Sequence, residues 1–236
     1  MRGYGQFCPV ARASQVFGER WTPLVVREML CGSRRFNDIH RGVPRMSATL
    51  LAQRLRKLEA IGVVRRERGP AGLAYGLTEA GEELRPIVMQ LGHWGARWVG
   101  SGLSRDELDV GLLMWDVRRS VRVDQTPPDR RVVVHFRFPD ARKGERLWWL
   151  LVEHGEADLC RDDPGHELTL IVESTVRVLT EIWNGDCRAD EAIRSGTLRV
   201  RGAQCDARAL WHWLGQSVFA ETRRGSVSSQ QRPTSM

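Results

Sequence analysis

One amphipathic segment indicates the fold of the first half of the chain: Ser47-Ala48-Thr49-Leu50-Leu51-Ala52-Gln53-Arg54-Leu55-Arg56-Lys57-Leu58. A serine in front of an apolar repeat is a common helix N-cap, so the segment predicts a helix that starts after Ser47 and ends before Gly62. At 100° per residue, three apolar positions form a narrow stripe that faces a core: Leu51, Leu55 and Leu58. Three polar positions lie near the opposite side: Thr49, Gln53 and Arg56. Arg54 lies between the two faces.

The segments around this helix predict a known order of elements. Apolar residues at helical spacing predict shorter helices over 9–17, 22–30 and 36–41. After it, two strand-like stretches flank the turn at 69–72 and form an arginine-rich hairpin. Thr78 is then expected to cap one long helix to residue 98, with a bend at Pro86. Helices, an arginine-rich hairpin and a long helix, in this order, are the arrangement of a winged helix-turn-helix.

The positive charge of the chain is concentrated in this first half. The 236 residues carry a net charge of +7, and residues 1–100 hold 16 Lys and Arg against 8 Asp and Glu. The remaining 136 residues hold 20 against 21. The charge distribution therefore favours a polyanionic partner for the first half only.

A helix-turn-helix places the outer face of its second helix in the major groove, so particular side chains become candidate DNA contacts. The candidates for contacts to base edges are Thr49, Gln53 and Arg56, since Gln can bind adenine and Arg can bind guanine through two hydrogen bonds. The candidates for phosphate contacts are Ser47, Lys57, Arg34 and Arg35. The candidate DNA contacts on the hairpin are Arg65, Arg66 and Arg68. Such charges also keep the edge of a hairpin soluble, which is the alternative role of these residues. Alternation along the strand allows only some of these three to face DNA.

These stretches resemble the HxlR-type regulators over residues 7–98. The motifs that carry the resemblance are Cys8-Pro9, Gly18-Glu19-Arg20-Trp21-Thr22, Arg34-Arg35-Phe36-Asn37-Asp38-Ile39, residues 47–59, Gly62-Val63-Val64-Arg65-Arg66 and Leu77-Thr78-Glu79-Ala80-Gly81. The resemblance implies a bacterial transcription regulator that binds double-stranded DNA as a homodimer paired through its terminal helices. A dimeric reader needs half-sites about one helical turn apart, so a roughly palindromic operator is expected.

The second half predicts a different architecture. Strand-like stretches at 131–138, 147–152 and 167–172 precede helical patterns, a short strand at 197–201 and a last helix at 206–214. Adjacent residues on a strand face opposite ways, so Trp148 and Trp149 are not expected to line one cavity. The fold class is therefore α+β. The expected domains are 7–100 (winged helix-turn-helix), 101–127 (helix and linker), 128–222 (sheet plus helices) and 223–236 (disordered tail).

The late segment from Ala192 to Gly202 resembles sterol-carrier-protein-like domains, over about residues 128–222. In that family a curved sheet covered by helices encloses an apolar pocket. The resemblance implies a small apolar ligand, whose contact residues the sequence leaves unknown. The tryptophans of this half serve equally well as core packing or as pocket lining.

Several classes of function have no support in the sequence. It has no catalytic motif, no His or Cys pair at metal-ligand spacing and no phosphate loop, so neither an enzyme, nor a metal site, nor a cofactor is expected. It has no apolar run of membrane-spanning length and no leader pattern. Five widely spaced cysteines favour reduced thiols, and hence a cytoplasmic protein without membrane association.

Three hypotheses remain. The first is a homodimeric repressor that responds to a small apolar effector through its second domain. The second is a regulator switched through Cys8, because the start of a helix stabilises a thiolate and some HxlR-type regulators sense oxidants at this place. The alternative role of this thiol is packing in the protein interior. The third is a lipid-handling protein or enzyme that the first domain only tethers.

Overall fold

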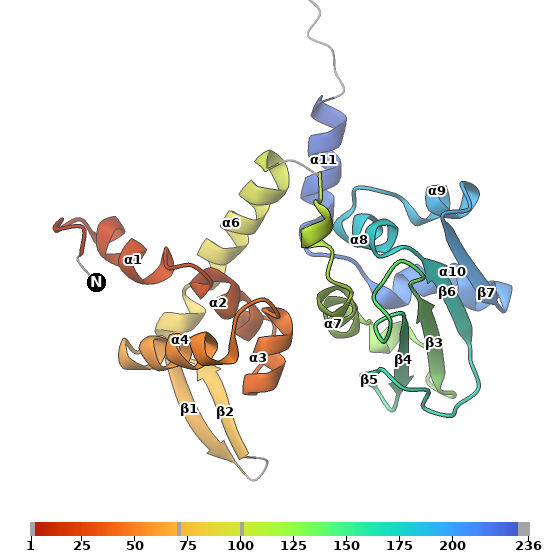
Figure 1. The fold of residues 1–236 in the computed structure, drawn as a ribbon, viewed down its shortest axis with the longest axis horizontal. Coiled ribbons are helices and arrows are strands. Elements are labelled where there is room, and N and C mark those ends of the chain that lie inside the picture. Colours follow the sequence, from red (N-terminus) through yellow and green to blue (C-terminus); the bar gives the residue numbers. More distant parts are fainter. Residues whose placement is uncertain (1–2, 70–71, 100–101, 231–236) are drawn as a thin grey trace, which may run out of the picture. The chain divides into compact units, whose positions relative to one another are not determined.

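The computed structural model describes residues 3–69, 72–99 and 102–230, and the chain divides into two compact units, Met1–Gly92 and His93–Met236 (Figure 1). The elements of the first unit are α1 (Pro9–Phe17), α2 (Thr22–Leu30), α3 (Phe36–Gly42), α4 (Ala48–Ala60), β1 (Val64–Gly69), β2 (Gly72–Leu77), α5 (Glu79–Glu82) and α6 (Arg85–Trp98), the last of which contains the division point. Helices α2, α3 and α4 and the hairpin share one core, which includes Val26, Ile39, Leu55 and Val64. The predicted winged helix-turn-helix order is confirmed.

The predicted long helix after Thr78 is instead two helices. Helix α5 ends at Glu82 and α6 begins at Arg85, so Pro86 stands in the first turn of a new helix. A proline lacks the N–H that a continuing helix needs but fits a first turn, which explains why it starts a helix here and does not bend one.

Gly81 allows the end of the hairpin to approach α5 closely. A Cβ atom at this position would overlap the carbonyl oxygen of Val63. The Thr78 hydroxyl accepts the Gly81 N–H at 3.2 Å and donates to the Gly62 carbonyl oxygen at 2.5 Å. The residues between the hairpin and α6 thus fix the hairpin at its base.

The second unit is a five-stranded sheet with helices. Its elements after α6 are η1 (Arg105–Glu107), α7 (Val110–Ser120), η2 (Val123–Gln125), β3 (Val132–Arg137), β4 (Leu147–Glu153), β5 (Glu156–Cys160), β6 (Leu170–Ser174), α8 (Val176–Asn184), α9 (Ala189–Arg194), β7 (Leu198–Gly202), α10 (Gln204–Leu214) and α11 (Ala220–Gln230). The strand order is β5-β4-β3-β6-β7, and β3 pairs with β6 in parallel while the other pairs are antiparallel. This sheet confirms the predicted α+β class. The sterol-carrier-like identity of the unit stays a prediction.

The two central tryptophans lie on opposite faces of the sheet, as strand alternation requires. Trp148 packs in the core that α7, α8 and α10 share with the sheet. Trp149 stacks on His135 of β3, with 4.4 Å between ring centroids. Burial lowers the pKa of His135, and the charge of Arg137 lowers it further.

Two elements of this unit differ from the sequence prediction. Strand β5, at the sheet edge, was not predicted. The tail expected to be disordered from 223 is helical as far as Gln230, while residues 231–236 lie outside the described part. Helix α11 is held by tertiary contacts at its start, because Arg223 Nε lies 2.6 Å from Asp186 and the Thr222 hydroxyl lies 2.7 Å from His93 Nδ1.

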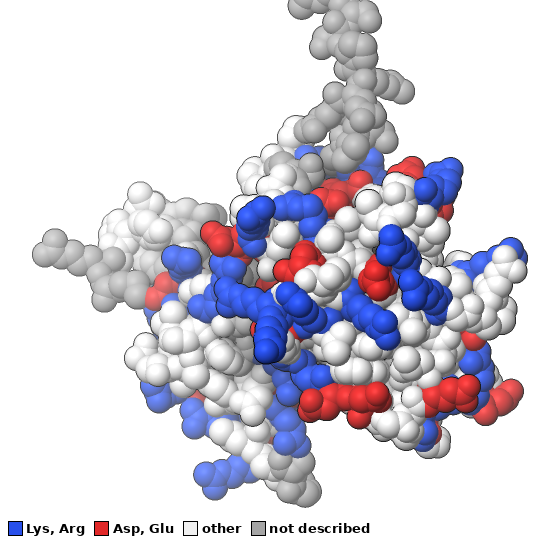
Figure 2. Space-filling view, turned by 45° about the vertical axis from the view of Figure 1, so that its right-hand side comes forward, with Lys and Arg blue, Asp and Glu red and all other residues white. Residues whose placement is uncertain are grey.

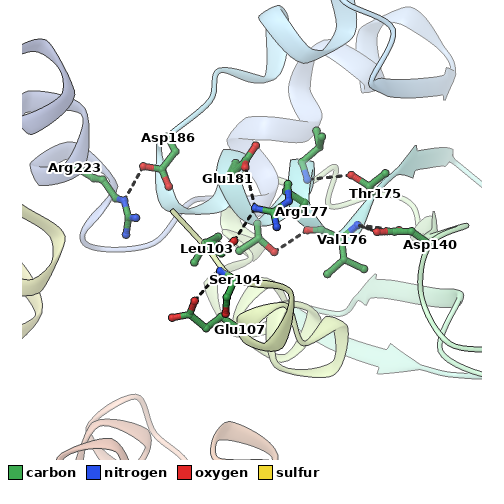
Figure 3. Close-up of polar contacts among 12 residues, drawn as sticks. Leu103, Ser104, Glu107, Asp140, Thr175, Val176, Arg177, Glu181, Asp186 and Arg223 are labelled. Atoms are coloured by element: carbon green, nitrogen blue, oxygen red, sulfur yellow. Dashed lines mark hydrogen bonds and ion pairs between the residues drawn. The ribbon is translucent and has the colours of Figure 1, made fainter. Parts of the chain in front are cut away.

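Polar contacts also fix the start of α8 (Figure 3). The Asp140 carboxylate accepts the Val176 N–H at 3.1 Å, and the Thr175 hydroxyl accepts the Val178 N–H at 3.2 Å. Arg177 donates to the Leu103 carbonyl oxygen at 3.0 Å, which ties the segment before α7 to α8. The N–H groups of Val176 and Val178 at this helix start are therefore bound by the protein itself.

Candidate nucleic-acid interface

Helix α4 presents a polar face to solvent and an apolar face to the core. Its N-cap is Ser47, whose hydroxyl accepts the Leu50 N–H at 3.2 Å, as the sequence predicts. The leucine stripe is at most 1% exposed: Leu51, Leu55 and Leu58. The three candidates for base contacts are all exposed: Thr49, Gln53 and Arg56. The structure thus brings these three candidates together on one open helix face.

Arg54 has a structural role on the inner side of α4. Its guanidinium forms an ion pair with Glu19, and the two side chains are only 10% and 17% exposed. Arg54 also donates to the Arg20 carbonyl oxygen at 3.3 Å, and burial lowers its pKa. Glu19 lies in the turn between α1 and α2, so this ion pair fixes α4 against that turn. In the sequence, the only sign of this pair is the placement of Arg54 between the two faces of the helix.

Lys57 shares the same acidic partner. Its Nζ lies 2.9 Å from the Glu19 carboxylate, and its side chain is 37% exposed. The predicted phosphate contact at this position would therefore compete with an intramolecular ion pair.

The turn between α2 and α3 carries two further candidates. Arg35 is the N-cap residue of α3 and is exposed. Arg34 is exposed and forms an ion pair with Glu67 on the hairpin. The Tyr75 N–H donates to the Arg34 carbonyl oxygen at 2.7 Å, so β2 holds this turn in place.

The three hairpin arginines fall on two faces. Arg65 lies on the same face as Glu67, which accepts from its Nε at 2.6 Å. Arg66 and Arg68 lie on the other face; Arg66 packs 6.0 Å from the Tyr75 ring centroid and pairs with Glu59 of α4 at 2.7 Å. Figure 2 shows basic side chains near the tip of this hairpin, at the bottom of the view. Gly72 has φ +97°, which suits a tight turn there.

Cys8 occupies the N-cap position of α1. Its side chain is half-buried and does not cap the helix, and Pro9 follows at the first helical position. All five cysteines are free thiols.

The described residues offer neither a metal site nor a membrane span. Among residues 3–69, 72–99 and 102–230, no group of three His, Cys, Asp or Glu side chains is placed to hold a metal ion. Within the same residues, no helix has the length and apolar character needed to cross a bilayer.

Comparison with known proteins gives matches to the first part of the chain. The model of the HxlR-like helix-turn-helix family matches residues 16–102. The HTH-type transcriptional regulator YvaP of Bacillus subtilis is 35% identical over 98 residues, 40% of this chain and 91% of that protein. YybR of the same organism is 40% identical over 91 residues, 37% of this chain and 73% of that protein.

One solved structure also matches part of this chain. The reduced form of the B. subtilis transcriptional regulator YodB is 28% identical and matches 42% of this chain and 100% of its own length, with a TM-score of 0.36. Since YvaP matches over nine-tenths of its length at 35% identity, the family assignment rests on the curated relatives. The chain belongs to the HxlR-like helix-turn-helix family of transcriptional regulators.

Proposed function

We propose that the first unit binds double-stranded DNA with the outer face of α4 in the major groove. The observation that carries the proposal is the exposure of Thr49, Gln53 and Arg56 on one face, directly opposite the buried leucine stripe. Gln and Arg at exposed helix positions can each form two hydrogen bonds with a purine edge. The ion pair between Glu19 and Arg54 supports the role, because it fixes the helix that would read the bases.

Phosphate contacts complete the proposed interface. Those that we assign are Ser47, Lys57, Arg34, Arg35, Arg65, Arg66 and Arg68. Several of these cations have carboxylate partners at the protein surface, and such exposed pairs contribute only about 0–1 kcal/mol each. A phosphate can therefore replace Glu67 or Glu59 at little cost. Lys57 is the weakest candidate, since its partner Glu19 also holds Arg54.

Salt dependence tests this electrostatic part. If a dimer neutralises about 6–10 phosphates, its affinity for DNA should fall by ~10³–10⁵ between about 50 and 200 mM salt. Arg68→Gln should reduce the slope of log affinity against log salt by about 2, one phosphate in each protomer. Arg208→Gln, at an exposed position on α10, is the control and should leave the slope unchanged. A flat salt dependence of the unmodified protein would contradict the phosphate assignments.

We propose that a second copy of the chain covers α6. Four large apolar residues of this helix are 50–67% exposed at spacings of four, three and four: Ile87, Leu91, Trp94 and Trp98. This spacing puts them on one helix face, and a contiguous apolar face of this kind marks an interaction surface. A homodimer paired through its terminal helices fits a roughly palindromic operator, whose half-sites selection of bound genomic fragments would reveal.

A charge-insertion variant tests this dimer. Leu91→Glu combined with Trp94→Glu should raise the dimer dissociation constant more than about 100-fold, because burial of such side chains contributes ~1.5–3 kcal/mol each. Sedimentation velocity of the full chain measures the change. The control is Ile193→Glu on α9, another exposed apolar position at 44% exposure. A double variant that remains dimeric assigns the interface elsewhere.

For regulation, we propose a repressor that a small apolar effector releases through the second unit. The support is the aromatic, helix-covered face of its sheet, with Trp148 and Trp213 in the core. An effector can act only if it binds the two states of the dimer with different affinity. The redox alternative assigns the switch to Cys8, whose half-buried thiol lies at a helix start.

One mobility-shift experiment separates these two forms of regulation. The redox alternative predicts that diamide releases DNA from the wild-type protein and not from Cys8→Ser. Cys205→Ser is the control, since Cys205 is an exposed thiol of α10 in the second unit. If Cys8→Ser also releases DNA under diamide, the redox role of Cys8 is refuted.

A further inference from the structure

The first unit contains a cavity whose lining includes two of the proposed phosphate contacts, Arg34 and Arg65. Its volume is about 270 Å³, and it lies between the end of α2, the base of the hairpin and the start of α6. Met29, Tyr75 and Leu77 also line the cavity, but their side chains belong to the buried core of the unit. The register puts the Tyr75 and Leu77 side chains on the face of Arg66 and Val64, opposite that of Arg65. Two glycines of the lining, Gly32 and Gly76, add no side-chain volume. The cavity is therefore an open hollow of the first unit that is lined mainly by polar groups.

Basic side chains dominate the charged part of the lining. It contains three guanidinium groups, from Arg34, Arg65 and Arg85, and one carboxylate, from Glu82. Arg85 lies 2.7 Å from Glu82, and its other terminal nitrogen is 3.4 Å from the Leu30 carbonyl oxygen. Each guanidinium has five N–H donors in a planar arrangement that suits a carboxylate or phosphate.

Arg34 and Arg65 share a single carboxylate. Both form ion pairs with Glu67 of β1, and the Arg65 hydrogen bond, with the charge of Arg34, holds the pKa of Glu67 below its ordinary value. Two guanidinium groups offer more donors than one carboxylate can accept. A Cβ at Gly76 would lie 3.0 Å from Glu67 Oε1 and 3.4 Å from Arg65 Cζ, so the glycine leaves room for this pair beside β2.

We propose that this cavity binds a small organic anion, namely a compact carboxylate. Arg85, Arg34 and Arg65 hold the carboxylate. The volume is just below the range of drug-sized pockets, which fits a ligand of this size. The side chains of Arg34, Arg65 and Arg85 are 52–56% exposed, so a DNA phosphate and a small anion would compete for them.

The position of the cavity couples it to the hairpin. An anion that takes donors from Arg34 and Arg65 competes with Glu67, which lies on the strand that carries the hairpin arginines. The bound anion also neutralises positive charge next to the proposed phosphate contacts. Such an anion therefore lowers the affinity of the protein for DNA, a step that rests on the proposed DNA binding. By linkage, bound DNA lowers the affinity for the anion by the same factor.

Calorimetric titration of the full chain with benzoate tests the site, with benzamide as its neutral counterpart. Benzoate should bind and benzamide should not. Arg85→Met should weaken benzoate binding at least about tenfold, since it removes a charged hydrogen-bond partner. The matched control is Arg41→Met. Like Arg85, Arg41 pairs with an acidic residue three positions away, and the two side chains are 63% and 52% exposed. Arg41 does not line the cavity. Equal binding of benzoate and benzamide, or equal binding by wild type and Arg85→Met, overturns the proposal, as does no binding of benzoate.

A mobility shift in saturating benzoate then tests the coupling. The wild type should lose DNA affinity and Arg85→Met should lose less. Unchanged DNA affinity of the wild type at saturation overturns the coupling. If Arg85→Met binds DNA more weakly without benzoate and binds benzoate like the wild type, these arginines serve the DNA backbone and the anion site is refuted. A protein that binds benzoate but no duplex refutes the proposed function alone, so the two failures are distinguishable.

Discussion

Replacement of Gln53 and Arg56 together by alanine is expected to lower the affinity for operator DNA by roughly 10³-fold, because each base contact contributes ~1–3 kcal/mol and a dimer makes each contact twice. Both side chains are exposed on α4 and contact solvent, so the free energy of unfolding should change little. A mobility-shift titration on a selected operator measures the loss. Binding to unrelated duplex should weaken much less, since phosphate contacts supply it.

The control for this variant is a similar pair of exposed side chains in the second unit. Gln204 and Arg208 lie four apart on α10, and their joint replacement by alanine should leave operator affinity unchanged. If the α4 variant retains wild-type affinity and sequence preference, α4 is not the reading helix. If it also loses biological output, the tethered lipid-handling alternative is excluded, since that alternative needs no base recognition.

Glu19→Ala is expected to destabilise the first unit by ~3–5 kcal/mol, because it leaves the guanidinium of Arg54 buried without its ion-pair partner. Chemical denaturation followed by tryptophan fluorescence measures the change, since Trp21 lies two residues from Glu19. Operator affinity should fall as well, because α4 loses a contact that fixes it to the turn between α1 and α2. The double variant Glu19→Ala with Arg54→Leu should recover most of the stability, as it removes the buried charge.

Glu59→Ala is the matched control for this prediction. Glu59 also pairs with an arginine, but the pair with Arg66 is 34% and 40% exposed. An exposed pair of this kind contributes at most about 1 kcal/mol. If Glu59→Ala lowers the free energy of unfolding as much as Glu19→Ala does, burial of the ion pair does not determine the size of the loss.

Local sequence patterns predicted the elements that carry the proposed interface. The serine cap and the leucine spacing of α4 both lie within one helix, so they can be recognised in the sequence without knowledge of the tertiary fold. The pair between Glu19 and Arg54 could not be predicted in this way, because its partners are 35 residues apart and meet only in the tertiary fold. The partner of Arg34 was missed for the same reason, since Glu67 is 33 residues away.

The missed elements have different physical causes. Strand β5 has no β-branched residue and alternates polar with small or apolar residues, so pairing with β4 at the sheet edge decides its conformation. Helix α11 has few apolar residues in its sequence, and the contacts of Thr222 and Arg223 with distant residues fix its start. A proline can bend one helix or stand in the first turn of a new one. The sequence around Pro86 does not distinguish these two outcomes, so the break before α6 was not predicted.

The parallel pairing of β3 with β6 has a consequence for biosynthesis. Val134 pairs with Leu170, 36 residues later, so the centre of the second sheet must close a long loop before it gains contacts. In the first unit, Val64 pairs with Leu77 across a short turn, and its helices follow one another directly. Local contacts of this kind form faster than distant ones. As the ribosome releases the chain from its N-terminus, the helix-turn-helix can complete its core while the strands of the sheet are still being translated.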